Sequence, residues 1–190
     1  MIGVLALQGA FAEHERVLER LGVPYRQLRQ KQDLDTIYDG FILPGGESTV
    51  QSKLLADLGM FAPLKEQIEA GAAVLATCAG MILLAQTIED DSLRSLGVIP
   101  MKVRRNAYGR QLGSFYTEDN VKGIGKVPMT FIRAPYVTEV APEVETLAIV
   151  DGNIVGVKYK NRMAFSFHPE LDESQAIHRR FLEYAGYDLS

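Results

Sequence analysis

The sequence predicts an α/β fold, in which an open, mixed but mostly parallel sheet is flanked by helices. Three observations support this prediction. Short apolar runs in the first half of the chain lack polar alternation, which is typical of parallel strands buried on both faces. Segments with apolar residues at helical spacing separate these runs, and such repetition builds open sheets with right-handed crossovers. From about residue 96 onward short β-like runs dominate, which indicates a mixed or antiparallel second half.

The elements of the first half follow in order. Short apolar or extended runs predict strands at residues 2–7, 25–28, 39–43 and 72–76. Helical spacing of apolar residues predicts a helix over residues 11–21, which the stop signal Gly22-Val23-Pro24 ends. Similar spacing predicts further helices over residues 48–58, 64–70 and 81–85.

The second half is expected to hold mainly strands. Apolar runs predict them at residues 98–103, 129–132, 146–150, 154–159 and 163–167. Asp151-Gly152-Asn153 is a hairpin signal between two of these runs. An amphipathic helix over residues 173–184 closes the chain. Because no repeat, linker or low-complexity segment interrupts the pattern, we expect one domain over residues 1–190.

Composition excludes several classes of protein. The chain has 190 residues, 47% of them hydrophobic and 23% charged, as in an ordinary globular domain. A single cysteine excludes an internal disulfide and argues against a cysteine-based metal site. No apolar run reaches the roughly 18 residues of a membrane span, and the N-terminal run lacks a basic leader, so we expect a cytoplasmic protein. A net charge of −4 without a basic run argues against nucleic-acid binding.

The single cysteine, Cys78, lies where a predicted strand ends and a helix begins. Its neighbours Ala76, Ala79 and Gly80 are small, as a nucleophile elbow requires, because that sharp turn presents a side chain at the top of the sheet. The N–H of Ala79 would then point to the place where an oxyanion forms. The alternative is a buried free cysteine that acts as a small hydrophobic residue.

His168 is the candidate base that would partner such a nucleophile. It ends an apolar strand and precedes Pro169-Glu170. In an extended chain residues two apart project to the same side, so we expect Glu170 to orient the His168 imidazole. A simple strand-end turn is the alternative, and a metal site is disfavoured because the additional cysteines of a zinc deaminase are missing.

The other two histidines are expected to be structural. His14 lies at the edge of the apolar stripe of the first helix, where a packing function is favoured. His178 stands beside Arg179 and Arg180, which predicts a solvated face of the last helix.

The segment Gly45-Gly46-Glu47-Ser48-Thr49 joins a strand to a helix. A phosphate cradle is disfavoured because Glu47 would repel phosphate and no lysine follows the glycines. Ser48 or Thr49 can cap the helix. The N–H of Gly46 can also serve as an oxyanion donor, since ligands of open α/β sheets bind at the carboxyl ends of the strands.

Three segments in this order resemble the motifs of the triad glutamine amidotransferases: Pro44-Gly45-Gly46-Glu47-Ser48-Thr49, Thr77-Cys78-Ala79-Gly80 and Phe167-His168-Pro169-Glu170. Further segments are similar to the glutaminase subunits of two-component pyridoxal 5′-phosphate synthases: Leu7-Gln8-Gly9, Arg105-Asn106-Ala107-Tyr108-Gly109-Arg110-Gln111 and Phe131-Ile132-Arg133-Ala134-Pro135. The resemblance covers nearly the whole chain and implies a class I glutamine amidotransferase-like, flavodoxin-like fold. One departure is Ala76, where many relatives in the wider superfamily have glycine.

The resemblance also implies a function for individual residues. Cys78 would be the nucleophile, His168 the general base and acid, and Glu170 the orienting carboxylate. Oxyanion N–H groups would come from Gly46 and Ala79. The positions implied for glutamine binding are Gly46, Glu47, Ser48, Arg105, Ile132 and Arg133. No metal and no cofactor are implied.

Arginine suits the glutamine site because a planar guanidinium binds an α-carboxylate bidentately. Glu47 could bind the α-ammonium. The alternative for Arg105 is a solvated loop charge within a basic cluster of Lys102, Arg104, Arg105 and Arg110. For Arg133 the solvated interpretation is weaker, since Ile132 and Pro135 flank it.

The implied activity is hydrolysis of L-glutamine to L-glutamate and ammonia through a glutamyl thioester. Ammonia would pass to a ring-building synthase subunit in a hetero-oligomer that makes pyridoxal 5′-phosphate, and that partner would complete the oxyanion hole. Residues 8–14 are a hypothesis for part of the docking face. Two alternatives stay open: a glutaminase that feeds another acceptor, such as an imidazole-glycerol phosphate synthase, and a non-catalytic glutamine sensor.

Overall fold

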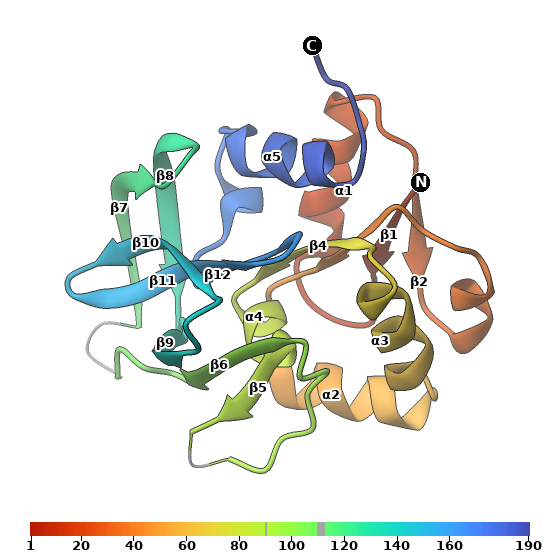
Figure 1. Cartoon of the computed structure of the whole chain (residues 1–190), viewed down its shortest axis with the longest axis horizontal. Coiled ribbons are helices and arrows are strands. Elements are labelled where there is room, and N and C mark those ends of the chain that lie inside the picture. Colours follow the sequence, from red (N-terminus) through yellow and green to blue (C-terminus); the bar gives the residue numbers. More distant parts are fainter. Residues whose placement is uncertain (90, 110–112) are drawn as a thin grey trace.

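The structure is a computed structural model that describes residues 1–89, 91–109 and 113–190. Its fold is built around one long sheet. The strand order is β2-β1-β3-β4-β12-β11-β9-β6-β5, and β10 pairs with β11 (Figure 1). A separate hairpin, β7-β8, lies beside the β10–β12 part of the sheet. The predicted mixed α/β sheet is therefore confirmed.

Neighbouring parallel strands form the half of the sheet that positions the site. In spatial order they are β2 (Tyr25–Leu28), β1 (Ile2–Leu5), β3 (Gly40–Leu43), β4 (Ala73–Thr77) and β12 (Arg162–Phe165). Every residue of β1, β3, β4 and β12 is buried, which explains why their sequences are continuous apolar runs. Their carboxyl ends meet at one edge, where ligands of open α/β sheets bind.

The other half of the sheet is mainly antiparallel. It contains β11 (Asn153–Tyr159), β9 (Tyr136–Val140), β6 (Ile99–Arg104), β5 (Ala85–Ile88) and β10 (Glu145–Val150). The β10–β11 hairpin turns at Asp151 and Gly152, whose φ angles are 51° and 80°. Positive φ at both turn residues is the geometry of a tight hairpin, which confirms that prediction. The separate hairpin pairs β7 (Ser114–Val121) with β8 (Gly125–Ile132).

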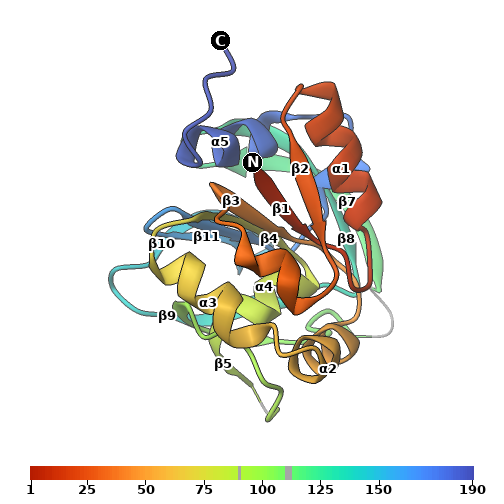
Figure 2. The same cartoon turned by 90° about the vertical axis from the view of Figure 1, so that its right-hand side faces the viewer.

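Helices cover both faces of the sheet (Figure 2). One face carries α1 (Phe11–Arg20) and α5 (Ala176–Tyr184), and the other carries α2 (Ser48–Asp57), α3 (Phe61–Glu69) and α4 (Ala79–Leu84). Two short 3₁₀ helices are η1 (Lys31–Asp35) and η2 (Pro169–Leu171). The sheet separates two hydrophobic cores, and alternate β1 residues point into each, as Val4 and Leu5 do. None of the helices in the described ranges is long and apolar enough to cross a membrane.

Three strands differ from the sequence expectations. The helix expected over residues 81–85 begins earlier, at Ala79, and gives way at Ala85 to strand β5. Strands β7 and β9 were not predicted, because their polar residues interrupt any apolar run. Strand β7 alternates exposed and half-buried side chains, as expected for a hairpin with one face in solvent.

Candidate active site

Cys78 occupies a strained turn between β4 and α4. Its φ is 51° and its ψ is −106°, a conformation that costs free energy in a residue other than glycine. The surrounding backbone holds it there, since the Cys78 N–H donates to the Phe165 carbonyl of β12 at 2.8 Å and the Met81 N–H donates to the Cys78 carbonyl at 3.0 Å. The turn has the geometry of a nucleophile elbow.

Small residues allow this turn because α4 packs tightly on the sheet. A Cβ atom on Gly80 would lie 2.1 Å from the carbonyl oxygen of Leu43 in β3, so only glycine fits there. Ala76, the departure from the wider superfamily, is fully buried within β4. Its methyl group is part of the hydrophobic core, and β4 keeps its pairing with β3 and β12 around it.

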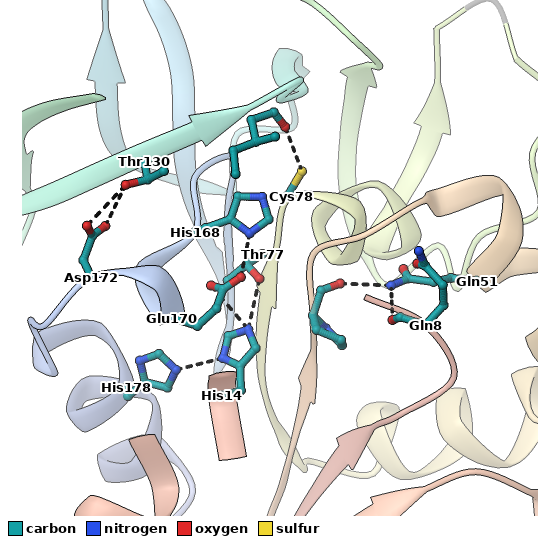
Figure 3. Close-up of polar contacts among 12 residues, drawn as sticks. Gln8, His14, Gln51, Thr77, Cys78, Thr130, His168, Glu170, Asp172 and His178 are labelled. Atoms are coloured by element: carbon teal, nitrogen blue, oxygen red, sulfur yellow. Dashed lines mark hydrogen bonds and ion pairs between the residues drawn. The ribbon is translucent and has the colours of Figure 1, made fainter. Parts of the chain in front are cut away.

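His168 and Glu170 meet beside Cys78 (Figure 3). His168 follows β12, and its Nδ1 lies 2.6 Å from Glu170 Oε1. This pair uses a geometry other than the expected one, because residues 169–171 form the 3₁₀ helix η2 rather than extended chain. The tight turn brings the Glu170 carboxylate to the His168 ring, and both side chains are buried.

The His168 imidazole contacts both partners at once. Burial disfavours the charged ring, but its hydrogen bonds to Cys78 and Glu170, together with the charges of these two groups, outweigh that cost and raise the pKa of His168 to about 10. Because Nδ1 is used by Glu170, Nε2 is the nitrogen that remains for Cys78. Cys78, His168 and Glu170 thus have the order that a nucleophile, a base and an orienting carboxylate would need.

Two backbone N–H groups adjoin the sulfur. Ala79 is the first residue of α4, so its N–H has no acceptor within the helix. The N–H of Gly46, which follows β3, donates to no acceptor within the described residues. Both residues line the same cavity as Cys78, which places two donors where an oxyanion could form.

The side chains of two glutamines hold the turn that carries Gly46. Gln8 Oε1 accepts the Glu47 N–H at 2.8 Å, and Gln51 Nε2 donates to the carbonyls of Gln8 and Pro44 at 3.0 and 3.2 Å (Figure 3). Gly9 packs so closely that a Cβ atom on it would lie 1.9 Å from the Gly45 oxygen. Gln8 and Gly9 therefore position the turn that carries Gly46, a function that sequence reasoning did not assign to them.

A cavity of about 650 Å³ opens above the sulfur. It brings together every predicted site residue except Glu170, which lies behind His168: Gly46, Glu47, Ser48, Cys78, Ala79, Arg105, Ile132, Arg133 and His168. Thr49, Ile82, Asn106 and Ser114 complete its lining, and sequence reasoning had not selected them as site residues. The residues that the structure describes contain no group of three or more His, Cys, Asp or Glu side chains placed to hold a metal ion.

The two arginines reach the cavity in different ways. Arg105 is paired with Asp91, and its hydrogen bond is the main cause that lowers the pKa of that carboxyl. It is therefore an oriented guanidinium, not a freely solvated charge. Arg133 is exposed and has a φ of 45°, and the carbonyl of the preceding Ile132 lies 3.8 Å from the Cys78 sulfur. Arg110 and Gln111 of the same sequence motif lie outside the described residues.

Comparison with known proteins decides the family. The model of the SNO glutamine amidotransferase family matches residues 4–185. The chain belongs to the SNO glutamine amidotransferase family. Among curated relatives of this amidotransferase is a protein from Desulfitobacterium hafniense named pyridoxal 5′-phosphate synthase subunit PdxT. It is 58% identical over 182 residues, which cover 96% of this chain and 92% of the relative.

Other relatives agree with this assignment. A PdxT protein from Streptococcus pneumoniae is 52% identical over 96% of this chain and 95% of its own length. A crystal structure described as a glutamine amidotransferase superposes with a TM-score of 0.93 at 42% identity. It covers 98% of this amidotransferase chain and 99% of its own.

One of the other two histidines of this amidotransferase contradicts the sequence expectations. His178 was expected on a solvated face, but it is fully buried, as is His14. The hydrophobic periodicity of the helices indicates this burial, because His14 stands three and four residues before the buried Val17 and Leu18. His178 has the same spacing to two buried residues of α5. Full burial also removes His14 from the docking face suggested for residues 8–14.

Proposed function

We propose that this chain is the glutaminase subunit of a pyridoxal 5′-phosphate synthase, which hydrolyses L-glutamine to L-glutamate and ammonia. The pairing of His168 with Glu170, beside Cys78 in a cavity lined by the candidate glutamine-binding residues, carries the proposal. Relatives more than half identical to the chain carry that synthase-subunit name, which favours this acceptor over others. We propose that residues 1–190 act as one domain, in the cytoplasm.

The first half of the reaction forms a thioester. The Cys78 sulfur attacks the side-chain amide carbon of glutamine, and the carbonyl oxygen becomes an oxyanion held by the N–H groups of Gly46 and Ala79. His168 then gives its proton to the amide nitrogen, the C–N bond breaks and ammonia leaves. Each oxyanion donor contributes about 10²–10³-fold, and general acid–base catalysis about 10²–10⁴-fold.

The second half hydrolyses the thioester. His168 takes a proton from water, the water oxygen attacks the glutamyl carbon, and the C–S bond breaks to release glutamate. Glu170 remains a carboxylate throughout. It holds His168 Nδ1 and stabilises the imidazolium that forms in each step.

Arg105 and Arg133 are the cations that line the cavity, and we assign the α-carboxylate of glutamine to them. Glu47 is the carboxylate that lines it and would bind the α-ammonium. Ser48 and the backbone of Ile132 complete the contacts at the ends of α2 and β8. Because Asp91 already holds one side of Arg105, the substrate would use the free edge of the guanidinium.

A partner is part of the proposal, because ammonia released into water becomes ammonium and is no longer a nucleophile. We propose that a ring-building synthase subunit docks over the cavity in a hetero-oligomer and receives ammonia directly. The strained backbone at Cys78 and Arg133, which both line the cavity, is the region that such docking would adjust.

The experiment is glutamine hydrolysis by the purified chain, with and without the candidate synthase subunit, followed by transfer of ¹⁵N from the glutamine amide. We expect activation by the partner and appearance of ¹⁵N in the pyridoxal ring. Cys78→Ala should abolish both, while ammonium salts should still support ring formation by the partner. Glutamine hydrolysis that supplies no ¹⁵N to the ring would indicate a glutaminase for another acceptor. Glutamine binding without hydrolysis would indicate a sensor.

A further inference from the structure

Two histidines outside the proposed reaction lie directly behind Glu170. His14 comes from α1 and His178 from α5, and both are fully buried. His14 Nδ1 lies 2.8 Å from His178 Nε2, while His14 Nε2 lies 3.2 Å from Thr77 Oγ1 and 3.4 Å from Glu170 Oε2 (Figure 3). A series of polar contacts therefore runs from His168 through Glu170 to the buried pair.

Both rings of this pair are neutral. Burial lowers the pKa of His14 well below its usual value, and the charges of His178 and His168 lower it further. Burial also lowers the pKa of His178 to about 4. The titratable groups that face His14 are His178 from α5 and His168 and Glu170 from the segment after β12, while β4 contributes the uncharged Thr77. Each neutral ring carries one N–H and one bare nitrogen.

The hydrogen-bond pattern selects one arrangement of these protons. If His14 donated to His178, then His178 Nδ1 would carry a hydrogen, and within the described residues it has no acceptor. The bare Nε2 of His14 would then face the Glu170 carboxylate. If His178 donates instead, its Nδ1 is bare, and His14 Nε2–H points toward Glu170 and Thr77. Buried N–H groups without an acceptor are rare, so the second arrangement is the one assigned.

From this geometry we propose that His14 is a positioning residue for the reaction, with its tautomer set by His178. Its Nε2–H bridges Thr77, the residue before the nucleophile, and Glu170 Oε2, which has no hydrogen bond from any other described side chain. The 3.4 Å separation is long for a hydrogen bond, as catalytic contacts in free enzymes often are, and we expect it to shorten during turnover. The inference rests on the proposed triad.

A matched pair of variants separates this function from simple packing. In His14→Gln the side-chain amide nitrogen takes the place of Nε2, so the N–H toward Thr77 and Glu170 is kept. In His14→Asn the amide group takes the place of Nδ1, so only the contact with His178 is kept. Both substitutions remove the same ring, and a packing function would make them equally harmful.

The test measures kcat and KM for glutamine from about pH 5 to 10, together with thermal unfolding, on the full chain with its synthase partner. We expect His14→Asn to lower kcat by about 10–100-fold, the size of one hydrogen bond to a charged group, with KM changed less than about twofold. The acidic limb of its pH profile should also move, because the site around His168 loses a hydrogen-bond donor. The kcat of His14→Gln should stay within about threefold of that of the unmodified chain, and the acidic limb of its pH profile should not move.

Equal losses in the two variants, or unchanged pH limbs in both, would overturn the inference. Alkylation of the single cysteine by iodoacetamide gives a second readout that needs no glutamine turnover. Its pH profile should shift in His14→Asn and not in His14→Gln. If the unmodified chain fails to hydrolyse glutamine with its partner, the proposed function fails, whereas the alkylation profiles still decide the connection between His14 and the triad.

Discussion

The imidazole of His168 packs directly against the α-carbon of Gly45. A Cβ atom on Gly45 would lie 2.1 Å from His168 Cε1 and 2.7 Å from Nδ1, closer than van der Waals contact allows. Gly45 thus limits where the His168 ring, the proposed base, can lie.

Gly45→Ala should therefore lower kcat. The added methyl pushes the imidazole away from its place, and misplacement by about 1 Å costs about 100-fold in kcat. Gly40→Ala is the control, since its Cβ would meet atoms of the core at 3.0 Å, away from the cavity. We expect that control to lose stability and to keep kcat. Steady-state kinetics beside thermal unfolding checks this, and an active Gly45→Ala chain would show that His168 does not need this limit.

Arg105→Lys tests the assignment of the α-carboxylate. A lysine keeps the charge but loses the planar fork, so KM for glutamine should rise about tenfold while kcat changes less than about threefold. Arg104→Lys is a neighbouring control, because Arg104 pairs with Glu89 and contacts Tyr136 and does not line the cavity. A KM that responds equally to both changes would point to a general effect of charge on the loop.

His168 should make stability depend on alkaline pH. Its pKa in the folded chain is raised to about 10 by Cys78 and Glu170 despite burial, whereas the unfolded value is near 6.5. A raised pKa stabilises the fold fully below about pH 6.5, and this contribution is lost as the pH rises toward about 10. Each unit of the shift corresponds to about 1.4 kcal/mol. Urea unfolding should show this slope in the unmodified chain and not in His168→Asn.

His178 should act in the opposite direction. Burial lowers its pKa to about 4, so below about pH 6.5 the unfolded chain binds a proton that the folded chain rejects. Stability is then complete above about pH 6.5 and falls as the pH drops toward about 4. His14 contributes in the same sense. His178→Gln, which can still donate to His14, should lose less stability between about pH 6.5 and 5 than the unmodified chain, and parallel slopes would contradict this.

The parallel half of the fold and the cavity residues were predictable from the sequence. Strands β1, β3 and β4 are buried on both faces, and their apolar runs are local signals that tertiary contacts do not change. The segments around Gly46 and Cys78 follow two of these strands directly, so their meeting at one edge follows from parallel pairing. Glu170 was also selected, although a 3₁₀ turn, not extended chain, brings it to His168.

The features that the sequence did not indicate depend on contacts between segments that are far apart in the chain. No glycine or proline marks the end of α4, so Ala85 was predicted as the end of the helix, whereas it begins strand β5 and pairs with Ile99 of β6. The interactions of His14 with Thr77 and Glu170 join three segments far apart in the chain. A histidine at a core-facing helix position has polar partners in the core only once these segments have folded together, so the sequence alone does not show them.

The most direct test of the account is to trap the glutamyl group on Cys78. The complete complex is mixed with ¹⁴C-labelled glutamine, quenched in acid within one turnover and examined by mass spectrometry. The account predicts a hydroxylamine-sensitive glutamyl adduct on the peptide that contains Cys78, and neither adduct nor ammonia release in Cys78→Ala. Glutamine hydrolysis that continues in Cys78→Ala would contradict the assignment of Cys78 as the nucleophile.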